Sequence, residues 1–312
     1  MISSIFGKTK PINYIIVLTF LFFFFWLVHF FLFDRAYSLE QLVFQTLVLG
    51  LLFFSFFIVN FIVKRNKITG SNSFAILFYV LLLVVFPETL LDSNTILCSF
   101  FLLLATRRLI SIRSLKNIKF KIFDATFWIM VSSLFYDWAL LYLVLVFVAV
   151  YMYEPKNIRN WMVPFAGIFT VAMIAQCLAI LANQNDFLTA HYQFSFEINV
   201  DYFLDWGNST KLITYILVTF FAGLLAFLKL GKTGMGKVFT MRLIALSFVI
   251  GLALHILKSS EYMHPILVTF FPSVVFLTKY VESIRRPNIK EIVLIASVIA
   301  PFLVLLISIA IQ

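Results

Sequence analysis

Charged residues are scarce in this chain. Asp, Glu, Lys and Arg together make up 12% of its 312 residues, whereas they account for about a quarter of an average soluble protein. Hydrophobic residues make up 62%, and 40 of them are Phe. Apolar stretches long enough to cross a bilayer recur from Ile12 to Ile311. The composition therefore excludes an ordinary soluble protein and indicates a polytopic membrane protein.

Cysteine and histidine are also rare, which excludes several kinds of site. The two cysteines, Cys98 and Cys177, fall inside apolar stretches, so neither a disulfide framework nor a thiolate metal site is available. The four histidines have no His-Glu-x-x-His spacing and no cysteine partner. The sequence thus identifies no cofactor and no metal site, and no pattern supports a bound divalent cation.

The net charge of +10 comes from basic residues that are spread over short loops. Such a distribution favours contact with anionic membrane lipid and does not favour binding to nucleic acid. The segment from Gly231 to Lys237 has the spacing of a phosphate-binding loop, but Val238 stands where that loop needs Ser or Thr. It also follows an apolar span instead of a strand, so we interpret it as a turn.

The apolar stretches predict an all-α protein with about eleven membrane helices in a single membrane domain, residues 1–312, and no soluble domain. A span needs about 20 residues to cross about 30 Å of hydrocarbon. The first stretch is too long for a cleavable signal peptide and has no small-residue cleavage site, so we expect it to remain as a span. The predicted segments are 13–33, 42–63, 73–91, 94–112, 125–137, 138–153, 161–182, 211–230, 238–257, 264–281 and 290–311.

Charge decides how region 125–153 crosses the membrane. The region has 29 residues and is interrupted at Phe135-Tyr136-Asp137-Trp138. If it folds back as two short helices, 21 of the 24 basic residues lie on one side, and only Arg35, Lys211 and Lys258 lie on the other. Because cytoplasmic loops carry the Lys and Arg excess, this arrangement is strongly favoured. It predicts a hairpin with Asp137 near its outer tip.

The resulting topology places the N-terminus inside and the C-terminus outside, in a bacterial inner membrane. We interpret the basic stretch 113–124 as a short amphipathic surface helix, and the longest outer loop is 183–210. Ten of the fourteen acidic residues lie outside. Acidic residues contribute little to topology, so this enrichment points to the outer face as the place for any chemistry.

Three outer carboxylates are candidates for catalysis. Asp34 follows the first span, Glu88 lies in a turn between two spans, and Asp137 lies at the tip of the hairpin. A carboxylate near the membrane interior is expensive unless it faces a cavity or a partner. The alternative for Asp34 is a capped interfacial turn in which Ser38 begins the next helix, and the alternative for Glu88 is a tight turn between helices.

Three other outer residues are candidates for holding a phosphate. They are Arg35, Lys258 and His264, with Lys211 as a further outer cation. A compact ammonium group kept outside against the positive-inside trend suits a phosphate or pyrophosphate. The alternative is that these lysines lie along the ends of helices with their charges in water.

The layout resembles the GT-C class of membrane glycosyltransferases, which use lipid-linked sugar donors. The resemblance covers most of the chain but is topological. The segments that carry it are Phe33-Asp34-Arg35-Ala36-Tyr37, Pro87-Glu88-Thr89-Leu90-Leu91, Leu102-Leu103-Leu104-Ala105-Thr106-Arg107-Arg108, Phe127-Trp128-Ile129-Met130 through Phe135-Tyr136-Asp137-Trp138, and Tyr262-Met263-His264-Pro265 leading to Phe271-Pro272.

The resemblance implies that Asp34 takes the place of the catalytic acidic residue and deprotonates an acceptor hydroxyl while a lipid phosphate leaves. The chain departs from the class in having one acidic residue there instead of a pair, and in lacking a large outer C-terminal domain. It also looks like an uncharacterised family of polytopic proteins from Bacteroidota.

The leading expectation is therefore a transferase that uses a polyprenyl-phosphate-linked sugar on the outer face. The alternative is a non-catalytic accessory or scaffold subunit of a membrane or envelope complex, which implies protein partners. A transporter comes third, because no span carries a charged residue deep in its middle.

Overall fold

The computed structural model describes residues 2–194, 200–230, 234–258 and 263–311, and within these ranges it is all-α with no strand. The helices are α1 (Ile2–Phe6), α2 (Pro11–Leu27), α3 (Leu39–Arg65), α4 (Phe74–Val85), α5 (Ser93–Ser111), α6 (Ile118–Ser133), α7 (Leu143–Tyr153), α8 (Ile158–Leu181), α9 (Phe187–His191), α10 (Val200–Leu204), α11 (Trp206–Leu228), α12 (Met235–Lys258), α13 (Phe270–Ser283) and α14 (Pro287–Ile311). Short 3₁₀ or π turns adjoin them, namely η1 (Val28–Leu32), η2 (Pro87–Leu90), η3 (Ile112–Ser114), η4 (Asp137–Tyr142) and η5 (Pro265–Thr269).

Within those ranges, eight helical segments are long and apolar enough to cross a membrane. The other three predicted segments are helices too short for that criterion: α4 with 12 residues, α6 with 16, and η4 followed by α7. Each of the eleven predicted segments thus overlaps a helix. A multi-pass membrane protein is confirmed.

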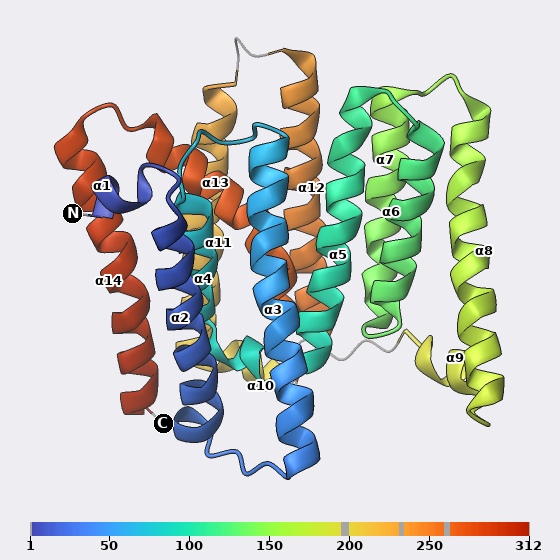
Figure 1. Ribbon diagram of the computed structural model, residues 1–312, viewed down its shortest axis with the longest axis horizontal. Helices are drawn as coiled ribbons and strands as arrows, with labels where there is room; N and C mark the ends of the chain where they lie inside the picture. The colour runs from blue at the N-terminus through green and yellow to red at the C-terminus, as the bar shows by residue number, and fades with distance from the viewer. Residues whose placement is uncertain (1, 195–199, 231–233, 259–262, 312) are drawn as a thin grey trace.

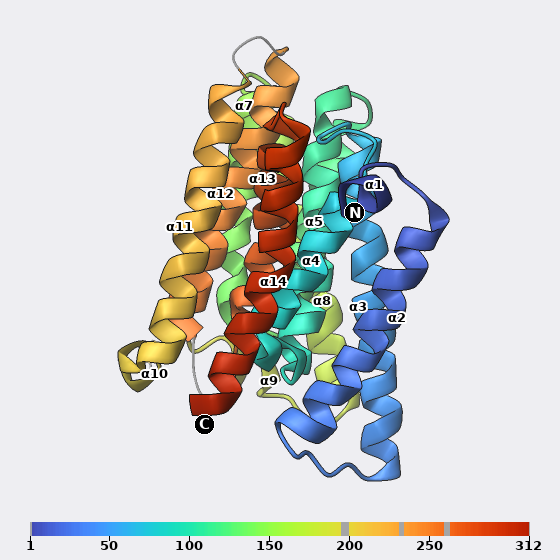
Figure 2. The same cartoon turned by 90° about the vertical axis from the view of Figure 1, so that its left-hand side faces the viewer.

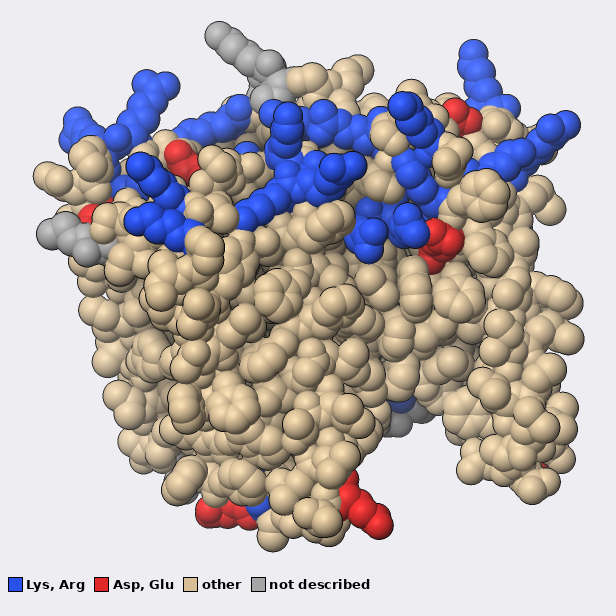
Figure 3. Space-filling view, in the orientation of Figure 1, with Lys and Arg blue, Asp and Glu red and all other residues tan. Residues whose placement is uncertain are grey.

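The region 125–153 folds back as predicted. α6 ends at Ser133, the chain turns, and η4 with α7 returns beside α6 (Figure 1). The chain therefore enters and leaves this hairpin at the same end of the bundle. Lys and Arg side chains form a nearly continuous band along that end in Figure 3, which we call the basic end. The two chain termini lie toward opposite ends of the bundle.

Two predicted boundaries are wrong in an informative way. The stretch 113–124 is not a separate surface helix, because α6 begins at Ile118 and includes its second half. The segment 73–91 is not one helix, because α4 ends at Val85 and η2 begins at Pro87. Pro87 restricts the residue before it to extended conformations, so the helix cannot continue through Phe86. The predicted turn from Gly231 to Lys237 falls partly outside the described residues.

Short sequence signals explain where several helices begin. Pro11 is the first residue of α2, where a missing N–H costs nothing. Ser38 caps α3 as predicted, and Gln41 completes a reciprocal capping box with it. Asp205 caps α11 by accepting a hydrogen bond from the Asn208 backbone at 2.8 Å.

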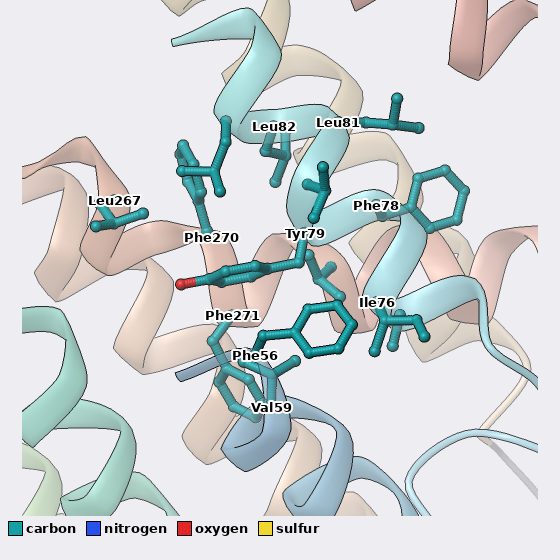
Figure 4. Packing of buried hydrophobic residues seen from close by; sticks show 14 of the residues in the cluster. Phe56, Val59, Ile76, Phe78, Tyr79, Leu81, Leu82, Leu267, Phe270 and Phe271 are labelled. Carbon is teal, nitrogen blue, oxygen red and sulfur yellow. The ribbon is translucent and has the colours of Figure 1, made fainter. Parts of the chain in front are cut away.

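The core of the bundle is formed by α4 and by the segment η5–α13. Eleven of the twelve residues of α4 are buried, and α4 packs directly against α13. In Figure 2, α13 and α14 stand between α11 and α12 on one side and α2 and α3 on the other. Figure 4 shows the Tyr79 ring of α4 among Phe270 and Phe271 of α13 and Phe56 of α3. α4 is therefore an interior helix and does not face lipid.

The Tyr79 hydroxyl provides a first prediction. It is buried and has no hydrogen-bond partner among the residues that the structure describes, whereas the Tyr215 hydroxyl bonds to both Thr269 and Ser273. Leaving a buried hydroxyl unsatisfied costs about 1–3 kcal/mol. Tyr79→Phe is expected to leave the unfolding temperature in detergent unchanged or raise it, while the matched change Tyr215→Phe lowers it. A clear loss of stability in Tyr79→Phe would show that this hydroxyl has a partner.

Candidate functional site

Three helical segments are broken at the end opposite the basic end. η2, η4 and η5 are all 3₁₀ turns, and each follows a residue with a non-helical backbone: Phe86, Tyr136 and His264, with φ of −122°, −138° and −125°. η2 and η5 are in contact with each other and with α5. Irregular backbone at membrane depth is tolerated only inside protein or beside a wet cavity. The breaks therefore mark a protected polar region.

The carboxylate of Asp92 joins these breaks. Its Oδ1 accepts a hydrogen bond from the Thr95 backbone at 3.0 Å, which caps α5. Its Oδ2 accepts bonds from the Thr95 hydroxyl at 2.6 Å, the Tyr136 hydroxyl, and the His264 backbone at 3.0 Å. Asp92 is 8% exposed. One buried carboxylate thus links α5 to the start of η4 and the start of η5, and we call this arrangement the Asp92 junction.

Asp137 lies next to the Asp92 junction and pairs with Lys258. The Lys258 Nζ lies 3.8 Å from Asp137 Oδ1, and the two side chains are only 11% and 6% exposed. The same oxygen accepts a hydrogen bond from the Trp138 backbone at 2.9 Å. A separation of 3.8 Å is an attraction between charges without a direct hydrogen bond. The ammonium group is therefore held near the carboxylate but not locked to it.

His264 and His255 complete the cluster around Lys258. His255 lies one turn before Lys258 on α12 and is fully buried, and His264 is 8% exposed. The Phe203 ring of α10 meets the His255 ring edge-on at 6.2 Å. Two of the predicted phosphate-binding residues are thus buried at this end, Lys258 beside Asp137 and His264 bonded through its backbone to Asp92.

Glu88 has a different partner. It lies in η2 and pairs with Lys211 of α11 at 3.4 Å, with side chains 12% and 14% exposed. One turn further along α11, Tyr215 packs against Phe86 at 5.3 Å between ring centres. These two contacts fasten η2 to α11. They give Glu88 a structural role that the sequence left open.

Asp34 and Arg35 lie apart from this cluster. Both are exposed, in the connection between η1 and α3, and Asp34 has a φ of 43°. The neighbouring His29 is buried and bonds to the Tyr37 hydroxyl and to the Leu90 carbonyl. Among the described residues, no hydrogen bond or ion pair joins Asp34 to Glu88 or to Asp137. The structure thus brings Asp137, Lys258 and His264 together, but places Asp34 on the surface.

A recess lies beside the hairpin of α6 and η4–α7. The hairpin of α6 and η4–α7 is shorter than its neighbours, so its tip lies set back from the end opposite the basic end (Figure 1). Figure 3 shows a hollow at this place, between the lobe of α8 and α9 and the rest of the bundle. We call it the recess. The tip of the α6–η4 hairpin lies on this side of the bundle.

Residues 187–194 lie at one side of the recess and contact the hairpin tip. His191 Nε2 lies 2.7 Å from the Ser133 carbonyl, and the Tyr192 hydroxyl lies 2.7 Å from the Ser133 Oγ. The Phe194 ring meets Trp138 edge-on at 5.5 Å. Burial raises the pKa of Tyr192, the Ser133 hydrogen bond lowers it, and the negative charge of Asp137 raises it again. Tyr192 therefore stays protonated beside the Asp137 carboxylate.

Sequence reasoning missed Asp92 and Tyr136. Asp92 was visible only as part of an outer turn, although the order Asp-Ser-Asn-Thr is a helix-capping signal. Nothing in the sequence indicated that the same carboxylate would meet His264, 172 positions later.

Other features of the surface do not form sites. No group of three His, Cys, Asp or Glu residues suited to a metal ion occurs within the described ranges. An open hollow of about 650 Å³ at the α7–α8 connection is lined by Tyr153–Arg159. It is made by consecutive residues of a single bend, so it belongs to the shape of that turn.

Comparison with protein-family models, with curated proteins and with solved structures finds no match to this chain. The functional argument therefore rests on the residues of the chain.

Proposed function

We propose that the protein is a membrane transferase that takes a polyprenyl-phosphate-linked sugar at the end opposite the basic end. The basic end faces the cytoplasm in this proposal, as the positive-inside rule requires, so the recess opens to the outer face of a bacterial inner membrane. The fold proposed to carry it is GT-C-like.

One observation carries this proposal, which is the convergence of three helix starts on the buried Asp92 carboxylate, beside the buried pair of Asp137 and Lys258. α5, η4–α7 and η5–α13 all begin at the Asp92 junction. Helix N-termini carry partial positive charge, although the Asp92 carboxylate already accepts hydrogen bonds from the Thr95 and His264 backbones. With Lys258 beside them, they form a place that attracts an anion. A phosphate on a lipid chain is an anion that reaches such a depth from the membrane.

The pair of Asp137 and Lys258 provides the chemistry. When the donor phosphate enters, Lys258 turns to it and leaves the carboxylate of Asp137 free. Asp137 then takes the proton of the acceptor hydroxyl as the acceptor oxygen bonds to the anomeric carbon of the sugar. The bond between that carbon and the phosphate oxygen breaks, and the electron pair leaves with the polyprenyl phosphate. Lys258 stabilises the added negative charge.

Two carboxylates are thus rival general bases. The resemblance to the GT-C class implies Asp34, whereas burial and the neighbouring Lys258 favour Asp137. In this proposal, Arg35 lies outside the phosphate site, and Glu88 supports the scaffold through Lys211.

Binding is tested first, with the purified protein in nanodiscs and a polyprenyl monophosphate as the probe. The phosphate is expected to bind, and the uncharged polyprenol is not. Lys258→Met is expected to weaken binding at least about tenfold, because one charge-assisted contact contributes about 1.5–3 kcal/mol. Lys211→Met is the matched control, since it also removes a buried lysine from this end. Equal binding of phosphate and alcohol would refute the proposed site.

Transfer is tested next, by release of polyprenyl phosphate from a polyprenyl-phosphate-linked sugar in the presence of membrane extract as the source of acceptor. Asp137→Asn is expected to abolish release and to retain binding of polyprenyl phosphate, which shows that the variant is folded. Asp34→Asn is expected to release at the normal rate. The opposite result would move the general base to Asp34. Absence of release from the unaltered protein, with binding intact, would leave a lipid-binding protein and end the transferase proposal.

A second candidate function is an accessory or scaffold subunit of an envelope complex. The observation that favours it is that the carboxylates Glu88, Asp92 and Asp137 are all bonded within the chain. Co-purification in mild detergent separates the two candidates, because a stoichiometric protein partner without bound lipid phosphate supports the scaffold.

A further inference from the structure

A small internal cavity lies in the middle of the bundle, away from the charged residues of the Asp92 junction. Its volume is about 10 Å³, and its lining comes from five segments: α5, η4, α12, η5 and α13. The lining residues are Ser99, Leu102, Leu103, Thr106, Tyr142, Ser247, Val268, Phe271 and Pro272. This volume is close to what a single buried water molecule requires.

Two hydroxyl groups of the lining have no partner. Ser99 is 5% exposed and Thr106 is 9% exposed, and neither side chain makes a hydrogen bond to another described residue. Nearby hydroxyls behave differently. Thr95 bonds to Asp92 at 2.6 Å, and Ser132 bonds to the Cys98 carbonyl at 3.1 Å. Ser99 and Thr106 are therefore exceptions on α5, and both border the cavity.

Further hydrogen-bonding capacity comes from the other walls. Pro272 has no N–H, so it donates no hydrogen bond to the Val268 carbonyl. The Tyr142 hydroxyl donates to the Ser247 carbonyl at 3.0 Å and keeps its own lone pairs. The cavity thus borders donors and acceptors from three different helical segments. Empty cavities in proteins are apolar, whereas polar cavities of this size hold water.

We propose that this cavity binds an ordered water molecule, held by the hydroxyls of Ser99 or Thr106 together with groups of the opposite wall. No charged side chain lines the cavity, so a cation has no counter-charge there. The volume is also too small for an organic ligand. In the interior of a membrane protein, unsatisfied polar groups are costly, and one water molecule satisfies several of them.

The water has a structural consequence for the outer end. The elements that it joins are the same ones that carry Asp92 on α5, Lys258 on α12 and His264 before η5. Gly251 brings α12 close to η5, since a Cβ there would lie 2.8 Å from Thr269 and 2.9 Å from the Tyr142 hydroxyl. The water therefore fills the small gap that remains between these closely packed helices. This inference does not depend on the proposed transferase activity.

X-ray radiolytic labelling of the whole protein in detergent tests the proposal. Radiation generates hydroxyl radicals from bound water in place, so a buried aromatic side chain is labelled only if water lies beside it. Tyr142 and Phe271 line the cavity and are 2% and 3% exposed. Tyr79 and Phe270 are equally buried but do not line it, which makes them matched controls. Labelling is expected at Tyr142 and Phe271 and not at the controls.

Variants then locate the water. Ser99→Val fills space and removes a hydroxyl, and it is expected to abolish labelling of Tyr142. Thr106→Val keeps the side-chain shape and is the second variant if Ser99→Val does not fold. Tyr142 labelled no more than Tyr79 in the unaltered protein would overturn the proposal. Labelling that changes when Na⁺ replaces K⁺ would assign the cavity to a cation and also overturn it.

Discussion

Asp92→Ala is expected to lower the free energy of unfolding by about 4 kcal/mol, the largest effect of any single substitution in this protein. The change removes an acceptor that takes four hydrogen bonds, from Thr95 twice, Tyr136 and the His264 backbone. Hydrogen bonds to a charged group contribute about 1.5–3 kcal/mol each, and losing the acceptor leaves buried donors unsatisfied. Equilibrium unfolding in mixed detergent micelles measures the effect.

Two further variants make this test specific. Asp34→Ala removes an exposed carboxylate from the same end and is expected to change stability by no more than about 0.5 kcal/mol. Asp92→Asn keeps one oxygen acceptor and turns the other group into a donor. Its loss in free energy of unfolding is therefore expected to lie between those of Asp34→Ala and Asp92→Ala. If Asp92→Ala and Asp34→Ala have the same free energy of unfolding, the Asp92 junction does not hold the three breaks together.

The path of the chain between the two ends of the bundle could be predicted from the sequence, because one strong physical rule applies to it. Charged groups do not cross hydrocarbon without cost, and Lys and Arg stay on the cytoplasmic side. The fold-back of region 125–153 followed from counting basic residues on the two possible sides, and the structure has this hairpin. Local caps were also readable, as Ser38 shows, because a cap depends on residues three positions apart.

The candidate site was less accessible from sequence, and the carboxylates Asp34 and Asp92 show why. Both follow an apolar stretch and lie in a polar turn, so their local sequence contexts look alike. One is exposed, and the other lies at the meeting point of three helical segments. The difference arises from the approach of His264 and Tyr136, which are distant in the sequence. Long-range packing of this kind leaves no pattern in the local sequence. The position of Asp137 at the hairpin tip did leave one, because the apolar region 125–153 is interrupted there.

The interior position of α4 had no local signal either. Its sequence is as apolar as that of a lipid-facing helix, and 11 of its 12 residues are buried. In membranes, helices that face lipid and helices that face protein are both apolar, so composition does not distinguish them. The short length of α4 and the Pro87 break were the only indications that it is not an ordinary span.

The pair of Asp137 and Lys258 is expected to show strong coupling in a double-mutant cycle. Removing one partner of a buried ion pair leaves an uncompensated charge and typically costs about 3–5 kcal/mol. Lys258→Met is therefore expected to destabilise the protein by about 3 kcal/mol. Adding Asp137→Leu removes the remaining charge, so the double variant is expected to be more stable than Lys258→Met alone.

A surface pair provides the control for this cycle. Arg108 and Asp124 are closer together, at 2.9 Å, but their side chains are 39% and 33% exposed. Exposed pairs contribute about 0.2–1 kcal/mol, because water screens them. The coupling between Asp137 and Lys258 is expected to exceed that of Arg108 and Asp124, although the buried pair has the longer distance. Equal coupling in the two cycles would mean that water reaches Asp137 freely, and the recess would then be too wet to hold a lipid phosphate through Lys258.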